Sequence, residues 1–216
     1  QKAAEMLSHM IKRKALQVAK IQKKIQGKEV LVIGAGPSLE KNIEFIKKNK
    51  KYVKIAANGV VEILLNKKIK PDIVVSDLDG NPKYLKMADK FGAIMVIHAH
   101  GDNMANLEKY VPKFSKVIGT TQVMPTENVY NFGGFTDGDR SVFLAEEMRA
   151  KSITLIGMDF DNMPRKFSTN DKDVDIDLKR KKLKFAKKLL EMLGKQSKSK
   201  LVNKSATRIR GIESQP

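Results

Sequence analysis

The sequence predicts a Rossmann-like, doubly wound α/β domain with a mostly parallel sheet, an N-terminal helical arm and a basic C-terminal helix. From residue 29 onward, short apolar runs alternate with amphipathic segments. Runs that are apolar at every position are typical of strands buried on both faces, and the helical segments between them are the usual crossovers of a parallel sheet. Polar motifs follow these runs directly, as expected where parallel strands end at one edge of a sheet.

The arm is predicted over residues 1–27, ahead of a main domain over residues 28–212. Residues 3–26 predict a single helix, because apolar residues recur at helical spacing between lysines. Gly27 is the type of residue that ends a helix. We expect this helix either to pack over the main domain or to form a subunit contact, which leaves a homodimer open.

The main domain alternates strands and helices along the chain. Strands are predicted at residues 30–33, 53–57, 73–75, 94–97, 115–119 and 153–156. Helices are predicted at residues 38–49, 60–67, 82–91, 103–110, 139–150 and 176–193, and the last of these is strongly basic. Residues 161–175 are predicted to form a loop, and residues 201–203 a last strand.

The composition excludes several kinds of site and points away from a membrane protein. The chain of 216 residues has no cysteine, which excludes disulfides, thiolate metal sites and a cysteine nucleophile. No apolar run reaches membrane-spanning length, and the first thirty residues lack the apolar core of a signal peptide. We therefore expect a cytoplasmic protein without a membrane partner.

The net charge of +18 raises the question of nucleic acid. Residues 1–28 hold eight Lys or Arg against one acidic residue, and residues 165–216 hold sixteen against six. Residues 29–164 are nearly neutral, with eighteen against seventeen. The chain has no tryptophan and no recognisable nucleic-acid motif, so we favour a lysine-rich solvated surface and expect no nucleic-acid partner.

Two aspartates, Asp77 and Asp79, follow the third predicted strand and precede Gly80. On an extended backbone they project to the same side, at the edge of the sheet where such folds bind phosphates. Two adjacent carboxylates repel each other unless a cation or a proton lies between them, so one interpretation is a magnesium site for a nucleotide. The alternative is a turn in which Gly80 supplies a positive φ.

A glycine-rich segment, Gly34-Ala35-Gly36-Pro37-Ser38, follows the first predicted strand. Glycines allow backbone N–H groups to approach a phosphate, and Ser38 is suited to cap the next helix. The segment is neither a Walker A loop nor a complete Gly-x-Gly-x-x-Gly, so a tight turn without a ligand is the alternative. Asn58, after the second strand, is either a nucleotide ligand or a helix cap.

His98, His100, Asp102 and Asn103 follow the fourth predicted strand. Two histidines two residues apart beside an aspartate resemble zinc ligands, but the sequence offers no third nitrogen or sulfur ligand nearby. We therefore favour contacts to phosphate or substrate, and Asp102 could instead cap the following helix. Thr121 and Gln122, after the fifth strand, are further substrate-binding candidates.

Glycines, aspartates and an arginine gather before the helix predicted at residues 139–150. Arg140 suits bidentate phosphate binding, while Asp137 and Asp139 could hold a second metal. Thr136 and Asp137 could instead cap the helix. After the sixth strand, Asp159 and Asp161 repeat the spacing of the earlier aspartate pair. Aspartates, glycine loops and one arginine favour phosphoryl or pyrophosphoryl transfer, which depends on positioning and charge neutralisation.

Together and in this order, these motifs resemble the archaeal 6-hydroxymethyl-7,8-dihydropterin diphosphokinase family, which is related to thiamine pyrophosphokinase. The motifs are Gly34-Ala35-Gly36-Pro37-Ser38-Leu39, Ser76-Asp77-Leu78-Asp79-Gly80, His98-Ala99-His100-Gly101-Asp102-Asn103, Gly133-Gly134-Phe135-Thr136-Asp137-Gly138-Asp139-Arg140 and Gly157-Met158-Asp159-Phe160. The resemblance covers about residues 28–212. It implies transfer of pyrophosphate from ATP to the hydroxymethyl group of a reduced pterin, with Mg²⁺ and release of AMP, in tetrahydromethanopterin or folate synthesis.

The resemblance implies that Asp77 and Asp79 hold Mg²⁺ against the ATP phosphates and that Thr136 and Asp137 help to hold nucleotide or metal. From the motifs and the resemblance together, we expect that Asp77, Asp79 and Asp137 would hold the metal, and that Asp77, Asp79 and Arg140 would act in catalysis. The nucleotide-binding set would be Gly34, Gly36, Pro37, Ser38, Asn58, Thr136, Asp137 and Gly138. The substrate-binding set would be His98, His100, Asp102, Asn103, Thr121, Gln122 and Asp159.

Three alternatives to this reading stay open at this point. One is an enzyme like thiamine pyrophosphokinase. Another is a glycosyltransferase-like enzyme using a nucleotide sugar, since proteins implicated in flagellin glycosylation share the Gly-x-Gly-Pro-Ser motif. The third is a non-enzymatic nucleic-acid-binding protein that uses the basic flanks.

Overall fold

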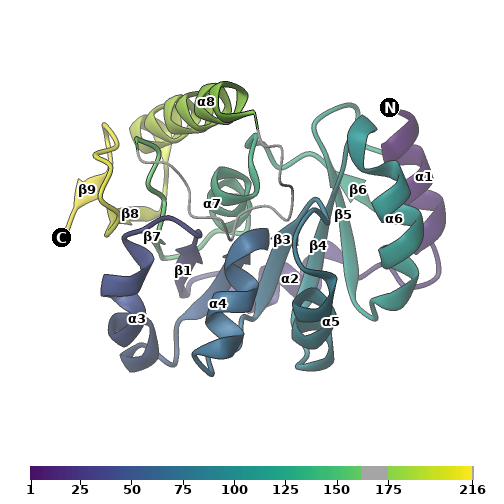
Figure 1. The fold of residues 1–216 in the computed structure, drawn as a ribbon, viewed down its shortest axis with the longest axis horizontal. Coiled ribbons are helices and arrows are strands. Elements are labelled where there is room, and N and C mark those ends of the chain that lie inside the picture. The colour runs from purple at the N-terminus through teal and green to yellow at the C-terminus, as the bar shows by residue number, and fades with distance from the viewer. Residues whose placement is uncertain (162–174, 216) are drawn as a thin grey trace.

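The computed structural model describes residues 1–161 and 175–215, and its centre is a β-sheet flanked by helices (Figure 1). The strands are β1 (Glu29–Ile33), β2 (Val53–Ala57), β3 (Ile73–Ser76), β4 (Ile94–Ala99), β5 (Val117–Thr121), β6 (Val129–Tyr130), β7 (Ser152–Ile156), β8 (Lys200–Asn203) and β9 (Glu213–Ser214). They lie in the order β6-β5-β4-β3-β2-β1-β7-β8-β9, and each neighbouring pair is parallel. The predicted α/β class is confirmed.

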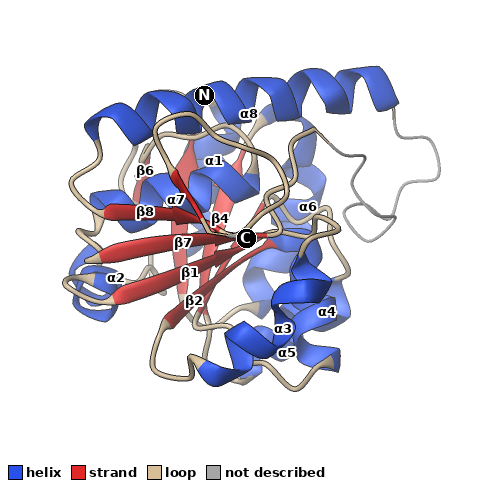
Figure 2. Ribbon diagram, turned by 90° about the vertical axis from the view of Figure 1, so that its left-hand side faces the viewer, coloured by secondary structure: helices blue, strands red, loops and turns tan. Residues whose placement is uncertain are grey.

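Helices cover both faces of the sheet. They are α1 (Lys2–Ile11), α2 (Val18–Ile25), α3 (Leu39–Lys48), α4 (Val61–Asn66), α5 (Pro82–Lys90), α6 (Met104–Tyr110), α7 (Asp137–Glu147) and α8 (Ile176–Gln196). The apolar residues of α1 and α3–α6 join one buried cluster, and those of α2, α7 and α8 join another. Figure 2 shows the twisted sheet between α3–α5 on one side and α7 and α8 on the other.

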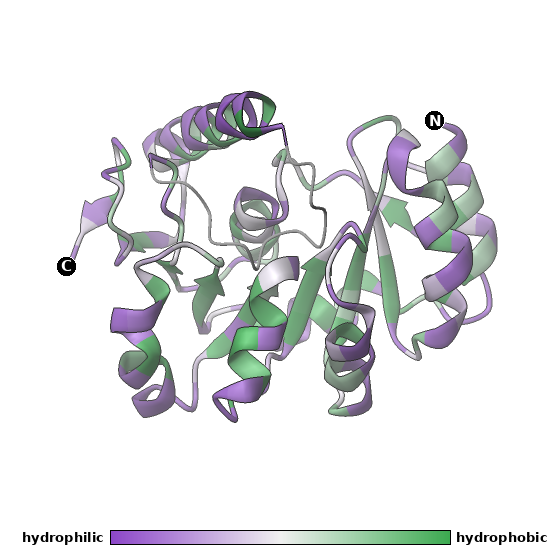
Figure 3. Ribbon diagram, in the orientation of Figure 1, coloured by the Kyte–Doolittle hydropathy of each residue, from purple (hydrophilic) through white to green (hydrophobic). Residues whose placement is uncertain are grey.

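The pleat of the strands explains why both faces are covered. Along β1, Leu31 and Ile33 belong to one cluster, whereas Val30 and Val32 belong to the other, and all four side chains are fully buried. Alternate side chains of a strand point to opposite faces, so an apolar residue at every position requires cover on both sides. The strands are accordingly hydrophobic and α8 largely hydrophilic in Figure 3.

The prediction of one helix over residues 3–26 is wrong, because the structure has two helices there. α1 buries Leu7 and Ile11 against one face of the sheet, while α2 buries Ile21 and Ile25 against the other. Between them the chain passes beside β5, where the backbone N–H of Leu16 donates to the Val117 carbonyl at 2.8 Å. Apolar residues at helical spacing look the same in the sequence whether they belong to one continuous helix or to two helices that pack on opposite faces of the sheet.

Other differences from the sequence-based prediction are smaller. β5 begins at Val117 instead of residue 115, and α7 begins at Asp137 instead of residue 139. β6 and β9 were not predicted, since each has only two residues. The loop predicted at residues 161–175 lies almost wholly outside the described residues. Among the helices that are described, none has the length and apolarity needed to cross a membrane.

The order of the strands fixes where a ligand can bind. From β1 the chain proceeds through β2 to β6 toward one edge of the sheet, then returns through α7 to β7, on the other side of β1. The connections that follow β1 and β7 therefore turn in different directions. In open α/β sheets this switch point leaves a crevice beyond the carboxyl ends of the strands, which is the usual ligand site.

Candidate active site

A cavity of about 600 Å³ lies at the carboxyl ends of the strands. It is lined by most of the predicted site residues, namely Gly34, Gly36, Asn58, Asp77, Asp79, His98, His100, Asp102, Gln122, Thr136, Asp137, Gly138 and Asp159. The structure does not bring Pro37, Ser38, Asn103, Thr121 or Arg140 to the lining. Motifs spread over more than a hundred residues of sequence therefore meet in one place.

The Asp77–Asp79 pair is held by a network behind it. The Ser76 hydroxyl donates to Asn58 Oδ1 at 2.9 Å and accepts from the Leu78 backbone N–H at 2.9 Å. This fixes the Asn58 amide with its Nδ2 toward the two carboxylates, donating to Asp77 Oδ1 at 3.4 Å and to Asp79. Asn58 thus orients the carboxylates from behind, although it also borders the cavity.

The turn and metal-site interpretations of this segment turn out to be compatible. The Asp79 backbone N–H donates to Asp77 Oδ1 at 3.3 Å, as in an Asx turn. The positive φ of this turn belongs to Leu78, at 70°, and not to Gly80. Gly80 is required for another reason, since a Cβ there would collide with the Asn58 side chain. The turn presents both carboxylates to the cavity.

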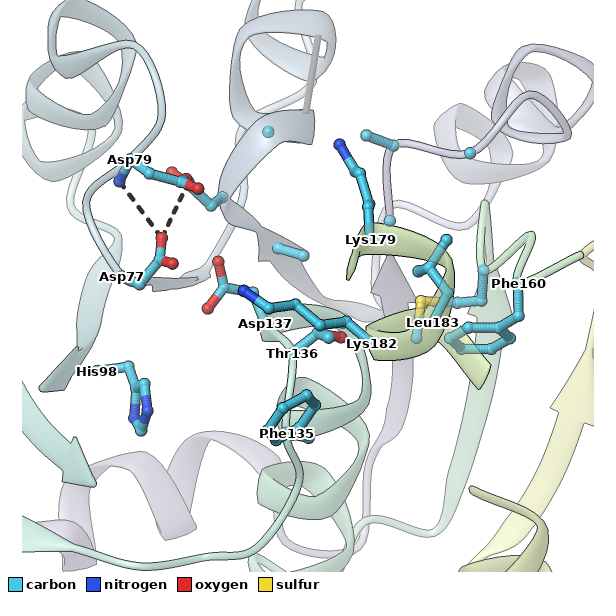
Figure 4. Close-up of a pocket in the computed structure, with 18 of the residues that line it drawn as sticks. Asp77, Asp79, His98, Phe135, Thr136, Asp137, Phe160, Lys179, Lys182 and Leu183 are labelled. Carbon is cyan, nitrogen blue, oxygen red and sulfur yellow. Dashed lines mark hydrogen bonds between the residues drawn. The ribbon is translucent and has the colours of Figure 1, made fainter. Parts of the chain in front are cut away.

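Asp137 adds a third carboxylate from the N-terminus of α7 (Figure 4). Burial raises its pKa well above the usual range, and the charges of Asp77 and Asp79 raise it further. Asp77 behaves differently: burial favours its neutral form, but hydrogen bonds with His100 and Asp79 outweigh burial and keep its pKa below the usual value. Three carboxylates that repel one another around a cavity are a suitable donor set for a hard divalent cation.

Asp139 has a structural role instead of the suggested metal role. Its carboxylate accepts from the backbone N–H groups of Phe135 at 2.7 Å and Thr136 at 2.8 Å, and from the Thr136 hydroxyl. With Thr136 as the N-cap this is a capping box, and Asp139 is fully buried. Its oxygens are therefore committed to the start of α7.

Arg140 lies behind the cavity wall and is only 1% exposed. Its guanidinium donates to the carbonyls of Gly133 and Phe135, each at 3.2 Å, and its Nε has no hydrogen-bond partner among the described residues. This arrangement does not offer the bidentate phosphate contact expected from the sequence. Its positive charge still acts at the site, because it lowers the pKa of Asp137 and so partly offsets the increase caused by burial.

The histidine motif combines a buried residue with one that faces the aspartates. His98 is 4% exposed, and its Nδ1 lies 3.3 Å from Thr120 Oγ1. Burial, followed by the charges of Arg140 and His100, lowers the pKa of His98 to about 3, so its ring is neutral at physiological pH. His100 Nε2 lies 3.7 Å from Asp77 Oδ2.

Asn103 and Thr121 support the strand ends from within the protein. Asn103 Nδ2 donates to the carbonyls of Asp77 and His98, both at 2.7 Å, and so ties the end of β3 to β4. Thr121 is fully buried. Across residues 1–161 and 175–215, no three His, Cys, Asp or Glu side chains are already gathered closely enough to form a metal-binding group.

The glycine-rich segment after β1 packs against the loop after β7. A Cβ at Gly34 would lie 2.6 Å from the Gly157 carbonyl oxygen, and one at Gly36 would collide with Asp159. The Asp159 carboxylate accepts from Ser38 N at 2.6 Å and Ser38 Oγ at 2.7 Å. Ser38 makes no side-chain cap for α3. These glycines allow two loops to meet at the switch point.

Comparison with known proteins identifies the same family as the one that the motifs resemble. The model of the family described as "6-hydroxymethylpterin diphosphokinase MptE-like" matches residues 2–164. This chain belongs to that family.

Relatives of this diphosphokinase-family member align over most of its length. A protein of Methanocaldococcus jannaschii is 43% identical over 191 residues, covering 82% of this chain and 79% of the relative. A protein of Pyrococcus furiosus is 49% identical over 179 residues, covering 81% and 75%. Both, with a third relative from Methanothermobacter thermautotrophicus, are named 6-hydroxymethyl-7,8-dihydropterin pyrophosphokinase.

A solved structure resembles this MptE-like chain at the level of the fold. The MAf glycosyltransferase from Magnetospirillum magneticum superimposes with a TM-score of 0.63 and 17% sequence identity. The match covers 88% of this chain and 34% of the glycosyltransferase. At that identity the likeness establishes the shared α/β fold alone.

One wall of the cavity was missed by the sequence analysis. Leu178, Lys179, Lys182 and Leu183 of α8 line it, together with Phe135 and Phe160. Figure 4 shows the two lysines extending from α8 on the side of the cavity across from Asp77 and Asp79. The spacing of the lysines on one face of a predicted helix was the only available signal. Nothing in the sequence showed that this face would reach the strand ends.

Proposed function

We propose that this protein transfers the pyrophosphoryl group of ATP to the hydroxymethyl group of 6-hydroxymethyl-7,8-dihydropterin and releases AMP. The observation that carries the proposal is the convergence of Asp77, Asp79 and Asp137 on one cavity in a member of this family. Relatives at 40–49% identity that bear the name of this activity support the choice of substrate.

The proposed reaction exchanges one phosphorus–oxygen bond for another. The hydroxymethyl oxygen attacks the β-phosphorus of ATP in line and loses its proton, while the bond from that phosphorus to the α,β-bridging oxygen breaks. AMP leaves with the bridging oxygen. Such reactions depend on positioning and on stabilising phosphate charge, which fits a site rich in carboxylates and glycine loops.

We further propose that Asp77, Asp79 and Asp137 hold Mg²⁺. The fit rests on the chemistry of the donors, since three mutually repelling carboxylates border the same cavity. When bound, the ion neutralises charge on the ATP phosphates. The low pKa of Asp77 keeps that carboxylate ionised at physiological pH, and Asn58 holds it in place.

The apolar part of the lining suits a flat ring. Phe135, Phe160, Leu178 and Leu183 line the cavity, and Figure 4 shows Phe135, Phe160 and Leu183 away from Asp77 and Asp79. Ligand cavities commonly combine such an apolar wall with a few polar groups that fix orientation. The adenine or the pterin ring would bury apolar area there, with the phosphates directed toward the aspartates.

The deciding measurement is AMP formation from ATP and Mg²⁺ with a panel of acceptors. We expect AMP with 6-hydroxymethyl-7,8-dihydropterin and only background levels with thiamine. A nucleotide sugar supplied in place of ATP should release no nucleoside diphosphate. Equal turnover with thiamine would overturn the pterin assignment, and absence of AMP with every acceptor would overturn pyrophosphoryl transfer itself.

The other functions considered from the sequence gain no support. The glycosyltransferase likeness concerns the fold, so it brings no nucleotide-sugar chemistry to this chain. The relatives' names favour the pterin over thiamine. The basic surface of α8 faces solvent only in part, because two of its lysines line the cavity.

A further inference from the structure

Helix α8 sorts its basic residues between the cavity and the solvent. Lys179 and Lys182 line the cavity, three residues apart and therefore on one face of the helix. Arg180, Lys181 and Lys184 come from the same two turns, and they are exposed, as Lys182 is, but they do not line the cavity. General surface basicity does not explain why two cations point at the strand ends.

The two lysines and the carboxylates face each other across the cavity. In Figure 4 both lysine side chains extend from α8 toward the side occupied by Asp79 and Asp137. Partial burial lowers the pKa of Lys179, the charge of Asp79 opposes this, and the charge of Lys182 adds to it. The charges of Lys182 and of Asp79, on the opposite wall, therefore both act on Lys179.

A cavity with carboxylates on one wall and ammonium groups on the other can hold a cation and an anion together. Carboxylate oxygens suit a divalent cation, whereas lysine ammonium groups bind phosphate oxygens as mobile point charges. A phosphate chain complexed to a divalent cation presents both kinds of group at once. Neither wall alone would neutralise it.

We propose that Lys179 and Lys182 bind the phosphate chain of the nucleotide from the wall opposite Asp77, Asp79 and Asp137. This inference rests on the proposed function and adds to it two substrate-binding residues. Both belong to a helix that lies beyond residues 2–164, the part matched by the family model. The remaining basic residues of α8 have no part in the proposal.

The test compares binding by variants of the full chain, measured calorimetrically with Mg²⁺. The ligands are ATP and inorganic tripolyphosphate, which carries a phosphate chain without a ring. Lys179→Ala and Lys182→Ala should each lower the affinity for both ligands about tenfold, and the double variant should lower it about a hundredfold. The matched control, Lys181→Ala with Lys184→Ala, removes the same charge from the same helix and should stay within about twofold of wild type.

A thermal melt separates loss of binding from loss of folding. If the alanine variants melt early, Lys179→Gln and Lys182→Gln retain most of the side-chain length and should show the same loss of affinity. A folded double variant that binds tripolyphosphate within about twofold of wild type would overturn the inference. Equal weakening by the control pair would also overturn it, because general charge would then account for the effect.

Assaying AMP formation in parallel keeps the two proposals distinguishable. If wild type produces AMP and the double variant binds like wild type, the lysine inference fails and the proposed function stands. If wild type produces no AMP but the double variant loses tripolyphosphate, the proposed function fails and the lysine inference stands. Wild-type protein that binds neither ligand would overturn the lysine inference.

Discussion

The chain contains two Asp-x-Asp segments at strand ends, and they have different roles. Asp77 and Asp79 follow β3 and face the cavity, with amide donors from Asn58 behind them. Asp159 follows β7, and its carboxylate accepts from Ser38 N, Ser38 Oγ and Ala206 N at 2.6–2.8 Å. The same spacing at the same edge of the sheet therefore gives, in one place, the pair that we propose to be reactive and, in the other, a structural anchor.

The difference lies in what surrounds each carboxylate. The oxygens of Asp159 are already satisfied by protein groups, and the residue is 6% exposed. Asp161, its partner in spacing, forms an ion pair with Lys187 at 3.3 Å near the surface. Asp77 and Asp79 instead border the cavity together with Asp137, and their charges raise the pKa of that third carboxyl group. Carboxylates that repel one another around a cavity can bind a cation, whereas a carboxylate surrounded by donors from two other segments holds those segments together.

The largest expected effect tests the reactive pair. Asp77→Asn should reduce kcat/KM for AMP formation about a thousandfold, because a metal-binding charge worth several kcal/mol is lost. The fold should survive, since an amide retains the shape of the side chain. The matched control is Asp161→Asn, the same change at the same type of motif, which should leave turnover within about twofold. Near-wild-type activity of Asp77→Asn would show that the two segments do not differ as argued.

The next effect tests the structural anchor. Asp159→Ala should lower the free energy of unfolding by about 3 kcal/mol, because buried donors at Ser38 and Ala206 lose a charged acceptor. Urea denaturation would measure this, with Asp161→Ala as the control on an exposed ion pair that contributes little. A loss below about 0.5 kcal/mol would remove the anchor role.

Much of the fold follows from the sequence because burial dictates it. Strands covered on both faces need apolar side chains at every position, which made β1 to β4 and β7 recognisable. The turn between α1 and α2 carried no such signal. It contains neither Gly nor Pro, and it is held by a tertiary contact of Leu16 with β5. A break fixed by distant partners cannot be identified from local spacing.

In the site, too, features set by the local sequence were predictable and features set by distant partners were not. Residues that follow strands directly were identifiable, since parallel strands end at a common edge. Their roles were not, because a role depends on partners from other parts of the chain. Asp159 accepts a hydrogen bond from the Ala206 backbone, and Arg140 donates to two nearby carbonyls while its Nε has no partner among the described residues, and none of this could be read from the sequence. Lys179 and Lys182 were overlooked because α8 approaches the cavity only through the tertiary packing of the fold.

A smaller effect tests the hydrogen-bond donor that lies behind Asp77 and Asp79. Asn58→Asp keeps the size of the side chain and its acceptor for Ser76, but it replaces the amide donor facing Asp77 and Asp79 with a negative charge. We expect kcat/KM to fall about tenfold to a hundredfold, through loss of one charged hydrogen bond and added repulsion. Steady-state kinetics would measure it. An unchanged kcat/KM would mean that the amide does not orient the pair.

The smallest effect is a gain in stability and comes from the third carboxylate. The pKa of Asp137 is raised from an ordinary value of 3.8, first by burial and then by Asp77 and Asp79. The folded protein therefore holds this proton more tightly than the unfolded chain does, and the free energy of unfolding falls as pH rises from about 4 through the raised pKa. Asp137→Asn carries no charge and escapes this loss. It should be about 1 kcal/mol more stable than wild type near pH 8 and equal to it near pH 4.

Magnesium should reverse that difference, because an ion bound only by the folded wild type stabilises it by mass action. Thermal melts at both pH values, with and without Mg²⁺, give the four comparisons needed. Asp159→Asn serves as the contrasting variant, since a saturated carboxylate should lose stability when it is neutralised, whatever the magnesium concentration. If Asp137→Asn were also destabilised near pH 8 without Mg²⁺, Asp137 would belong with Asp159 as an anchor, and the carboxylate set proposed for the metal would be reduced to two.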